Sequence, residues 1–260
     1  MTKSRRHYQR GGNKLAIYHA AQGGNLAKVK ELVEEGYIVA SPRKSVRASA
    51  RKSAKKSVKS SPKGSVREKV DINMTNYEGH TPLYAASQYG HFDIVKYLVG
   101  KGADKDKAEK DPNGPTDEAA TPLWVACQNG NIDIVKYLVE RGADMDVTYE
   151  YGMTPLHNAA LHCRLEIVKY LVERGADKDK VTRNKKTPLM FALDKGCLQV
   201  VDHLIEKGAD IDVPQKYEKH SEYLKGKKLE YFKKFIKTVD KKDVLVDDVI
   251  FNIKSFTKGL

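Results

Sequence analysis

The tripeptide Thr-Pro-Leu recurs in this chain at a fixed interval. Three copies begin 33 residues apart, at Thr121, Thr154 and Thr187, and a fourth begins 40 residues upstream, at Thr81. A regular period of this length is the signature of supersecondary units that stack side by side, because each unit buries its apolar face only against a neighbour. The period therefore predicts one elongated array, and it directs the search for function towards surfaces rather than a catalytic pocket.

Each copy begins a segment with two helical patterns. In residues 81–104, Thr81 can cap a helix, and Pro82 suits the first helical position, where its missing N–H costs nothing. Gly90 and Gly102 predict the ends of a first and a second helix, because glycine adopts left-handed backbone easily. The second helix has apolar residues at spacings of three and four: Ile94, Val95, Leu98 and Val99.

The same chemistry recurs in the copies that start at Thr121, Thr154 and Thr187, and a weaker copy without the Thr-Pro start covers residues 15–37. These segments resemble the ankyrin repeat family, which has a 33-residue period and the signature T-P-L-H-x-A. The resemblance covers residues 15–213 apart from two insertions. It implies an all-α repeat solenoid of about five helix-turn-helix units joined by hairpins.

Four residues depart from the family pattern. Cys163 stands where a glycine should follow the first helix of the fourth repeat, and Lys185 replaces a turn glycine. Tyr149 and Thr182 occupy positions where the family usually has a turn aspartate. The hairpins around these residues are expected to be less regular.

The pattern divides the chain into segments. We expect a basic N-terminal tail at 1–14, a degenerate first repeat at 15–39, a disordered insertion at 40–69, repeat two at 70–106, repeat three with a hairpin insertion at 107–146, repeat four at 147–179, repeat five at 180–213 and a helical extension at 214–260. The seven extra residues of repeat three suit either a contact finger or an inert loop. The extension suits two amphipathic helices that cap the last repeat or bind a partner.

The insertion at 40–69 is strongly basic and almost devoid of large apolar side chains. It has eleven basic residues and one acidic residue, a net charge of +10, whereas residues 70–214 have 17 basic and 23 acidic residues, a net charge of −6. Such a composition cannot offset the entropy lost on ordering, so we expect disorder. Serine recurs at every fourth position, which gives the candidate phosphorylation sites Ser41, Ser45, Ser49, Ser53, Ser57 and Ser61.

Several roles suit this insertion. Its Ser-Pro-Arg-Lys start resembles the tails of linker histones, which implies nucleic-acid binding through phosphate contacts. Serines beside basic residues also suit kinases, and each phosphate would add about −1.5 to −2 charges. A nuclear-import signal, an anionic membrane surface and a solvated linker without a partner remain alternatives.

The cysteines and the N-terminus indicate an intracellular protein in the cytoplasm or nucleus. Cys127, Cys163 and Cys197 are odd in number and lack paired spacing, so reduced thiols are expected. The first residues have no apolar signal-peptide core, and no apolar run approaches the roughly 18 residues that span a membrane. We expect a monomer.

No motif predicts catalysis, a cofactor or a metal. The glycines are isolated helix ends, no G-x-S-x-G sequence is present, and no Cys/His spacing suits zinc. By resemblance to the family, His157 has a structural role.

The candidate binding residues are those that repeat arrays vary between copies. They lie on the concave face that the family forms from hairpins and first helices, and tyrosine is enriched at interface hot spots. The candidates are Tyr77, Glu78, His80, Gln88, Tyr89, Gln128, Asn129, Glu150, Tyr151, Met153, His162, Arg183, Asn184 and Lys186. We expect a non-enzymatic protein–protein interaction module, a scaffold or adaptor for an unidentified protein. The alternative is a nucleic-acid- or chromatin-associated adaptor that uses residues 40–69.

Overall fold

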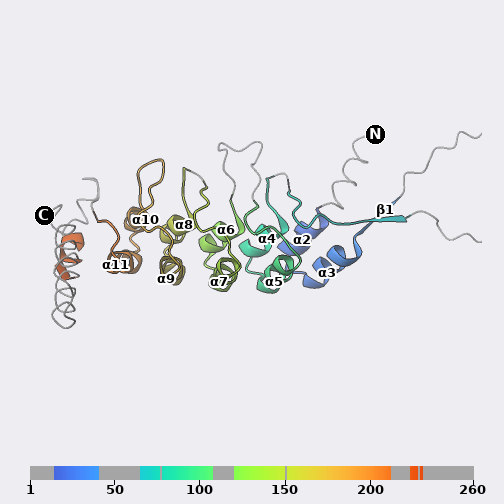
Figure 1. Ribbon diagram of the computed structural model, residues 1–260, viewed down its shortest axis with the longest axis horizontal. Helices are drawn as coiled ribbons and strands as arrows, with labels where there is room; N and C mark the ends of the chain where they lie inside the picture. The colour runs from blue at the N-terminus through green and yellow to red at the C-terminus, as the bar shows by residue number, and fades with distance from the viewer. Residues whose placement is uncertain are drawn as a thin grey trace, which may run out of the picture.

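The protein is an elongated array of paired helices. The computed structural model describes residues 15–40, 65–76, 78–107, 120–149, 151–211, 223–227 and 229–230. Within these ranges five helix pairs follow one another, as the period predicts (Figure 1). The first helices are α2 (Ala16–Gln22), α4 (Pro82–Gln88), α6 (Pro122–Asn129), α8 (Pro155–Leu161) and α10 (Pro188–Lys195). The second helices are α3 (Leu26–Glu35), α5 (Phe92–Gly100), α7 (Ile132–Glu140), α9 (Leu165–Glu173) and α11 (Leu198–Glu206).

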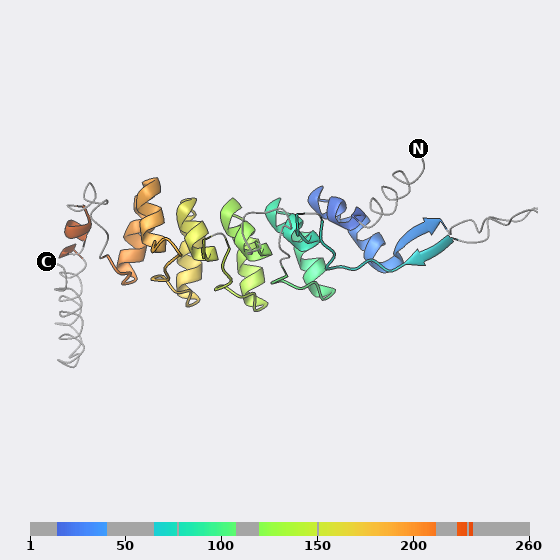
Figure 2. The ribbon, with the colours of Figure 1, turned by 90° about the horizontal axis from the view of Figure 1, so that it is seen from above.

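The two kinds of helix form two parallel rows. Each first helix contacts the first helix of the next repeat, and the second helices α3, α5, α7, α9 and α11 do the same in the other row (Figures 1 and 2). The loops before α8 and α10 project beyond the row of first helices (Figure 1). Hairpins and first helices therefore share one side of the array.

The Thr-Pro start forms a helix cap in each of the four copies that have it. The Thr81 hydroxyl accepts the backbone N–H of Tyr84 at 3.1 Å, and Thr121 accepts that of Trp124 at 3.2 Å. The prolines occupy the first turn, where no intrahelical partner for an N–H exists. Gly90 follows α4 with φ +77°, which confirms the predicted helix end.

One continuous core joins all five repeats. Small residues of the first helices, such as Ala86 and Ala126, are fully buried and let the second helices approach closely. The second helices contribute branched side chains, for example Leu98 and Leu138, which are also fully buried. Because every repeat buries its apolar stripe against its neighbours, stability is shared along the array.

Two short strands differ from the expected course of the insertion. Strands β1 (Tyr37–Ala40) and β2 (Ser65–Glu68) pair antiparallel, with Tyr37 opposite Glu68 and Ala40 opposite Ser65. The stretch 40–69 is therefore not a single disordered segment, because its two ends form a ladder. Residues 41–64, which include all six candidate phosphorylation sites, lie outside the described residues.

Part of the C-terminal extension packs on the last repeat. Residues 223–227 are helical, and Leu224 is buried in the same core as α10 and α11. The Tyr223 hydroxyl donates to the Asp202 carboxylate, and Lys227 forms an ion pair with Asp202 at 3.2 Å. These contacts agree with a capping role for this part of the extension.

The prediction of reduced, unpaired cysteines is wrong for two of the three. Cys163 and Cys197 form a disulfide between repeats four and five, with a Cα–Cα distance of 5.3 Å. They are 34 residues apart in sequence, one residue more than the repeat period, so stacking brings them together. Cys127 is free and buried, and burial raises the pKa of its thiol. None of the helices that the structure describes has the length and apolar character that a bilayer crossing requires.

Candidate protein-interaction face

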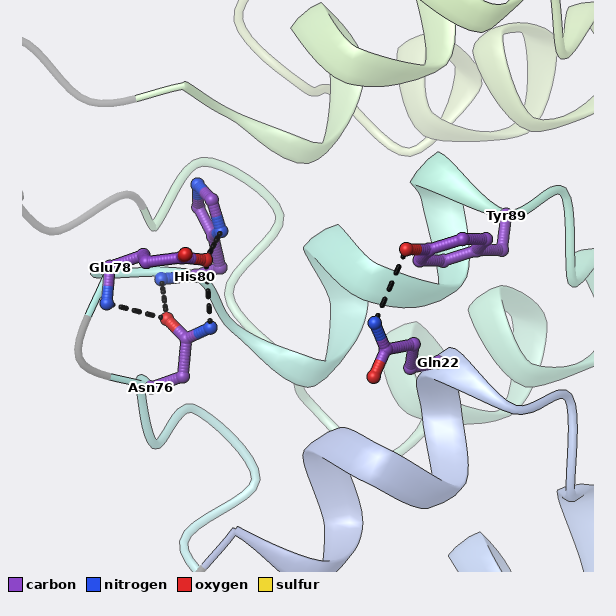
Figure 3. Close-up of polar contacts among 5 residues, drawn as sticks. All are labelled: Gln22, Asn76, Glu78, His80 and Tyr89. Carbon is purple, nitrogen blue, oxygen red and sulfur yellow. Dashed lines mark hydrogen bonds and ion pairs between the residues drawn. The ribbon is translucent and has the colours of Figure 1, made fainter.

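The hairpin before α4 presents a polar cluster that its own backbone holds in place. The Asn76 side-chain oxygen accepts the backbone N–H groups of Glu78 and His80 at 3.0 and 2.9 Å (Figure 3). The Glu78 carboxylate lies 3.3 Å from Nδ1 of His80, and the His80 ring stacks on Tyr84 with centroids 3.9 Å apart. Glu78 is exposed at the tip, so this hairpin offers a carboxylate at a fixed position.

The other end of α4 carries a large exposed aromatic side chain. Tyr89 directly follows the helix and is 52% exposed. Its hydroxyl accepts a hydrogen bond of 3.2 Å from Nε2 of Gln22 in α2, as Figure 3 shows. Gln88, its neighbour, is half-buried. Candidate residues thus occur at both ends of α4, and we call this side of the array, hairpins plus first helices, the hairpin face.

In repeat three the candidates lie at the end of α6. Asn129 is exposed, but its amide donates to the Val125 carbonyl of its own helix at 3.0 Å. Gln128 is half-buried, and its backbone carbonyl accepts from Nε of Arg164 at 3.1 Å. Gln128 occupies the repeat position that Gln88 has in repeat two.

The hairpin before α8 carries Tyr151, which is 54% exposed and has the left-handed φ of 57°. Its carbonyl accepts the backbone N–H of Arg183 at 2.8 Å, which joins the hairpins of repeats four and five. Met153 is buried at 8% exposure, so it supports the hairpin from below and is not a surface contact as predicted. Tyr77 and Glu150 lie outside the described residues.

The departures from the family pattern still leave closed turns. Thr182 donates its N–H to the Lys186 carbonyl at 3.0 Å, and its hydroxyl accepts the N–H of Lys186 at 3.1 Å. Tyr149 exchanges two backbone hydrogen bonds of 2.8 Å with Met153, which close the turn before α8. Lys185, in place of a glycine, adopts φ 55°.

The remaining candidates lie around α8 and α10. Arg183 and Asn184 are exposed at the hairpin of repeat five. Lys186 is half-buried and forms an ion pair of 2.6 Å with Asp194. His162, after α8, is half-buried, and its Nδ1 contacts the Asn158 carbonyl at 3.0 Å. These residues continue the hairpin face to the end of the array.

A second apolar cluster beneath the hairpins escaped the sequence analysis. Trp124 contacts the Tyr149 ring edge-on with centroids 4.7 Å apart, and both belong to a cluster with Tyr84 and Met153. The signal was available, because Tyr84, Trp124, His157 and Met190 all occupy the fourth position of the Thr-Pro-Leu copies. All of these four residues are buried, so this position supports the hairpins.

His157 fastens α8 to the next hairpin. Its Nδ1 accepts the backbone N–H of Thr154, and its Nε2 donates to the carbonyls of Lys180 and Lys186 at 3.0 and 3.2 Å. Burial lowers the pKa of His157 to about 4, so the imidazole is neutral at pH 7. This agrees with the structural role that the family resemblance implies. Among the described residues, His, Cys, Asp and Glu side chains do not gather in a group that could hold a metal ion.

Comparisons with known proteins agree with this architecture. The family model for ankyrin repeats matches three times, over residues 3–109, 46–149 and 123–215. Alpha-latrocrustotoxin-Lt1a of Latrodectus tredecimguttatus is 53% identical over 38 residues, and protein phosphatase 1 regulatory subunit 27 of Mus musculus is 40% identical over 52 residues.

These two relatives are matched over short stretches only. The matches cover 15% and 20% of this chain, and the chain spans 3% of the toxin and 34% of the phosphatase subunit. Ankyrin repeats bind protein partners, and the family generally serves as a non-enzymatic interaction scaffold. Since the family model spans nearly all of the helical array, the chain belongs to the ankyrin repeat family.

Proposed function

We propose that this protein is a non-enzymatic scaffold or adaptor that binds another protein through the hairpin face. The observation that carries the proposal is the exposure of Tyr89 and Tyr151, at 52% and 54%, at positions that hydrogen-bond to a neighbouring repeat. Gln22 holds the Tyr89 hydroxyl, and Arg183 holds the Tyr151 carbonyl.

Two physical reasons make these tyrosines suitable anchors. A tyrosine offers a large contact area with few rotatable bonds, so little side-chain entropy is lost when a partner covers it. A partner that covers the rings also removes apolar surface from water, which favours association. The polar tips around them, including Glu78 and Arg183, would then set the orientation of the partner.

The test uses the full chain as bait in affinity purification, with bound proteins identified by mass spectrometry. The variant replaces the tyrosines at 77, 89 and 151 by alanine, and the matched control is Leu198→Ala, which removes an exposed apolar side chain from a second helix. We expect the main partner to be lost from the tyrosine variant and retained by the control, with unchanged circular dichroism in both. Undiminished capture by the tyrosine variant would place the contact elsewhere.

A second candidate function rests on the net charge of +10 in residues 40–69. A nucleic-acid- or chromatin-associated adaptor would use this charge to displace counterions from phosphates. Replacement of residues 41–64 by a two-residue Asn-Gly turn tests it, because this turn still lets the two flanking strands pair. Loss of salt-dependent DNA binding with intact protein capture would support this function, and unchanged DNA binding would exclude this segment as its carrier.

A further inference from the structure

One contact recurs between neighbouring repeats, made by the residue that precedes the second helix of repeats two, three and four. His91 places Nε2 3.0 Å from the Gln22 carbonyl, and Asn131 donates to the Ser87 carbonyl at 2.7 Å. Arg164 donates Nε to the Gln128 carbonyl at 3.1 Å. Each reaches back to the end of the preceding first helix, where carbonyl groups lack intrahelical partners. We call this contact the polar clamp.

The polar clamp lies against a glycine of the preceding repeat. Gly24, Gly90 and Gly130 follow their first helices with φ of 72°, 77° and 84°. A Cβ added to these glycines would lie 2.7, 3.2 and 3.1 Å from the nearest side-chain atoms of His91, Asn131 and Arg164 respectively. The repeat geometry therefore brings the glycine position of one repeat against the clamp position of the next.

Between repeats four and five, both of these positions are cysteines. Cys163 occupies the glycine position, with the left-handed φ of 56°, and Cys197 occupies the clamp position before α11. Their Cα atoms are 5.3 Å apart, inside the range that a disulfide bridges without backbone movement. A thiol is only a weak hydrogen-bond donor, so the reduced pair cannot replace the clamp of the other repeats.

We propose that Cys163 and Cys197 form a redox-controlled fastener that takes the place of the polar clamp and governs local opening of repeat five. Cys163 is exposed and Cys197 is buried, so a small disulfide reagent meets Cys163 first. The Cys163 thiolate attacks the small disulfide and releases one small thiolate. The Cys197 thiolate then attacks the Cys163 sulfur and releases the second.

This exchange is balanced and reversible. The two cysteines lose two protons and two electrons and gain one S–S bond, while the small disulfide becomes two thiols. An excess of small thiol runs the same steps backwards. The fastener thus responds to the thiol–disulfide balance of its surroundings. This response is a property separate from partner binding on the hairpin face.

Such a fastener matters in repeat five, because repeat four is its single neighbouring repeat and residues 223–227 are a short segment on its other side. At the hairpin end His157 holds it through the carbonyls of Lys180 and Lys186 in either redox state. At the opposite end of α8 the disulfide makes the corresponding connection between repeats four and five. A link across 34 residues restricts the opened state, and we expect it to suppress opening of α10 and α11 about a hundredfold or more.

The experiment measures amide hydrogen exchange of the full chain in two redox states. A Cys127→Ala background removes the third thiol, and Ala160 at the equivalent position of repeat four shows that alanine fits there. The protein is incubated with oxidised glutathione or with dithiothreitol. We expect a linked Cys163–Cys197 peptide only after oxidation, together with slower exchange in α10 and α11 and unchanged exchange in α4 and α5.

A matched variant restores the ordinary clamp. Cys163→Gly with Cys197→Asn reproduces the Gly90 and Asn131 pair of the preceding repeats, and its exchange in α10 and α11 should be independent of redox state. Absence of the linked peptide, equal exchange in the two states of the parent, or a redox response in the Gly/Asn variant would each overturn the proposal.

Discussion

Truncation of Leu138 to alanine tests whether the five repeats share one core. Leu138 is fully buried in α7, and α7 packs between α5 and α9. At about 0.8 kcal/mol for each methylene-sized group, the lost side chain accounts for about 2.4 kcal/mol of transfer free energy. Helices on both sides prevent full collapse of the site, so the cavity raises the total to about 3 to 4 kcal/mol.

Urea unfolding followed by circular dichroism measures this loss. We expect a single transition for the parent and for Leu138→Ala, with a lower midpoint for the variant, since neighbouring repeats are coupled. Lys136→Ala, on the exposed side of the same helix, is the control and should change stability by less than about 0.5 kcal/mol. A loss below about 0.5 kcal/mol for Leu138→Ala would refute the assigned register.

Three further predictions concern pH, a turn and the basic segment. The stabilisation from the neutral His157 is complete above pH 6.5, and about 3 kcal/mol of it is lost as the pH falls to about 4, because the imidazole protonates first in the unfolded chain. The free energy of unfolding, measured with denaturant from pH 7 to 4, should therefore fall less steeply in His157→Gln than in the parent, and equal slopes would contradict this. Gly90→Ala should lower the free energy of unfolding by more than the roughly 1 kcal/mol expected for Gly102→Ala. Both glycines have positive φ, but only at Gly90 would the new Cβ meet the Asn131 amide. Equal losses of stability in urea would show that the polar clamp imposes no restraint. Glutamate substitution of four serines in segment 40–69, at Ser45, Ser49, Ser53 and Ser57, should weaken DNA binding and its salt dependence. The added negative charge offsets the basic residues, although less than phosphate does. Unchanged DNA affinity across salt concentrations would make the segment an inert linker.

The repeating elements were predictable because each depends on local chemistry. Thr81 caps α4 as its position before Pro82 predicts, and Gly90 follows the end of the helix with left-handed backbone. The spacing of Ile94 and Leu98 places both on the buried stripe of α5. These signals repeat at a fixed interval, so the stacking of one unit on the next followed from the same residues.

Other features depend on which residues meet in space. Cys163 and Cys197 look unpaired in the sequence because their relation appears only after the repeats are superposed. Met153 varies between copies as surface residues do, yet the ring of Trp124 makes its site part of the apolar support. The pairing of residues 37–40 with 65–68 escaped notice because the basic stretch between them dominates the composition.

The exposed fraction of each side chain distinguishes candidate residues that share one position in the repeat. The family register assigns the same status to Tyr89, Asn129 and His162, which occupy one repeat position. Tyr89 places its ring towards solvent, whereas Asn129 and His162 direct polar atoms to carbonyls of their own helices. Of these three residues, Tyr89 therefore offers the largest exposed apolar surface to a partner.

The central claim is that a protein partner covers the hairpin face. Hydrogen-exchange mass spectrometry of the free chain and of its complex with the captured partner tests this claim most directly. The account predicts slower exchange on binding in residues 78–80, 88–89, 128–129, 151–152 and 183–186, with little change in α5, α7 and α9. Protection confined to those second helices, or to residues 41–64, would contradict it.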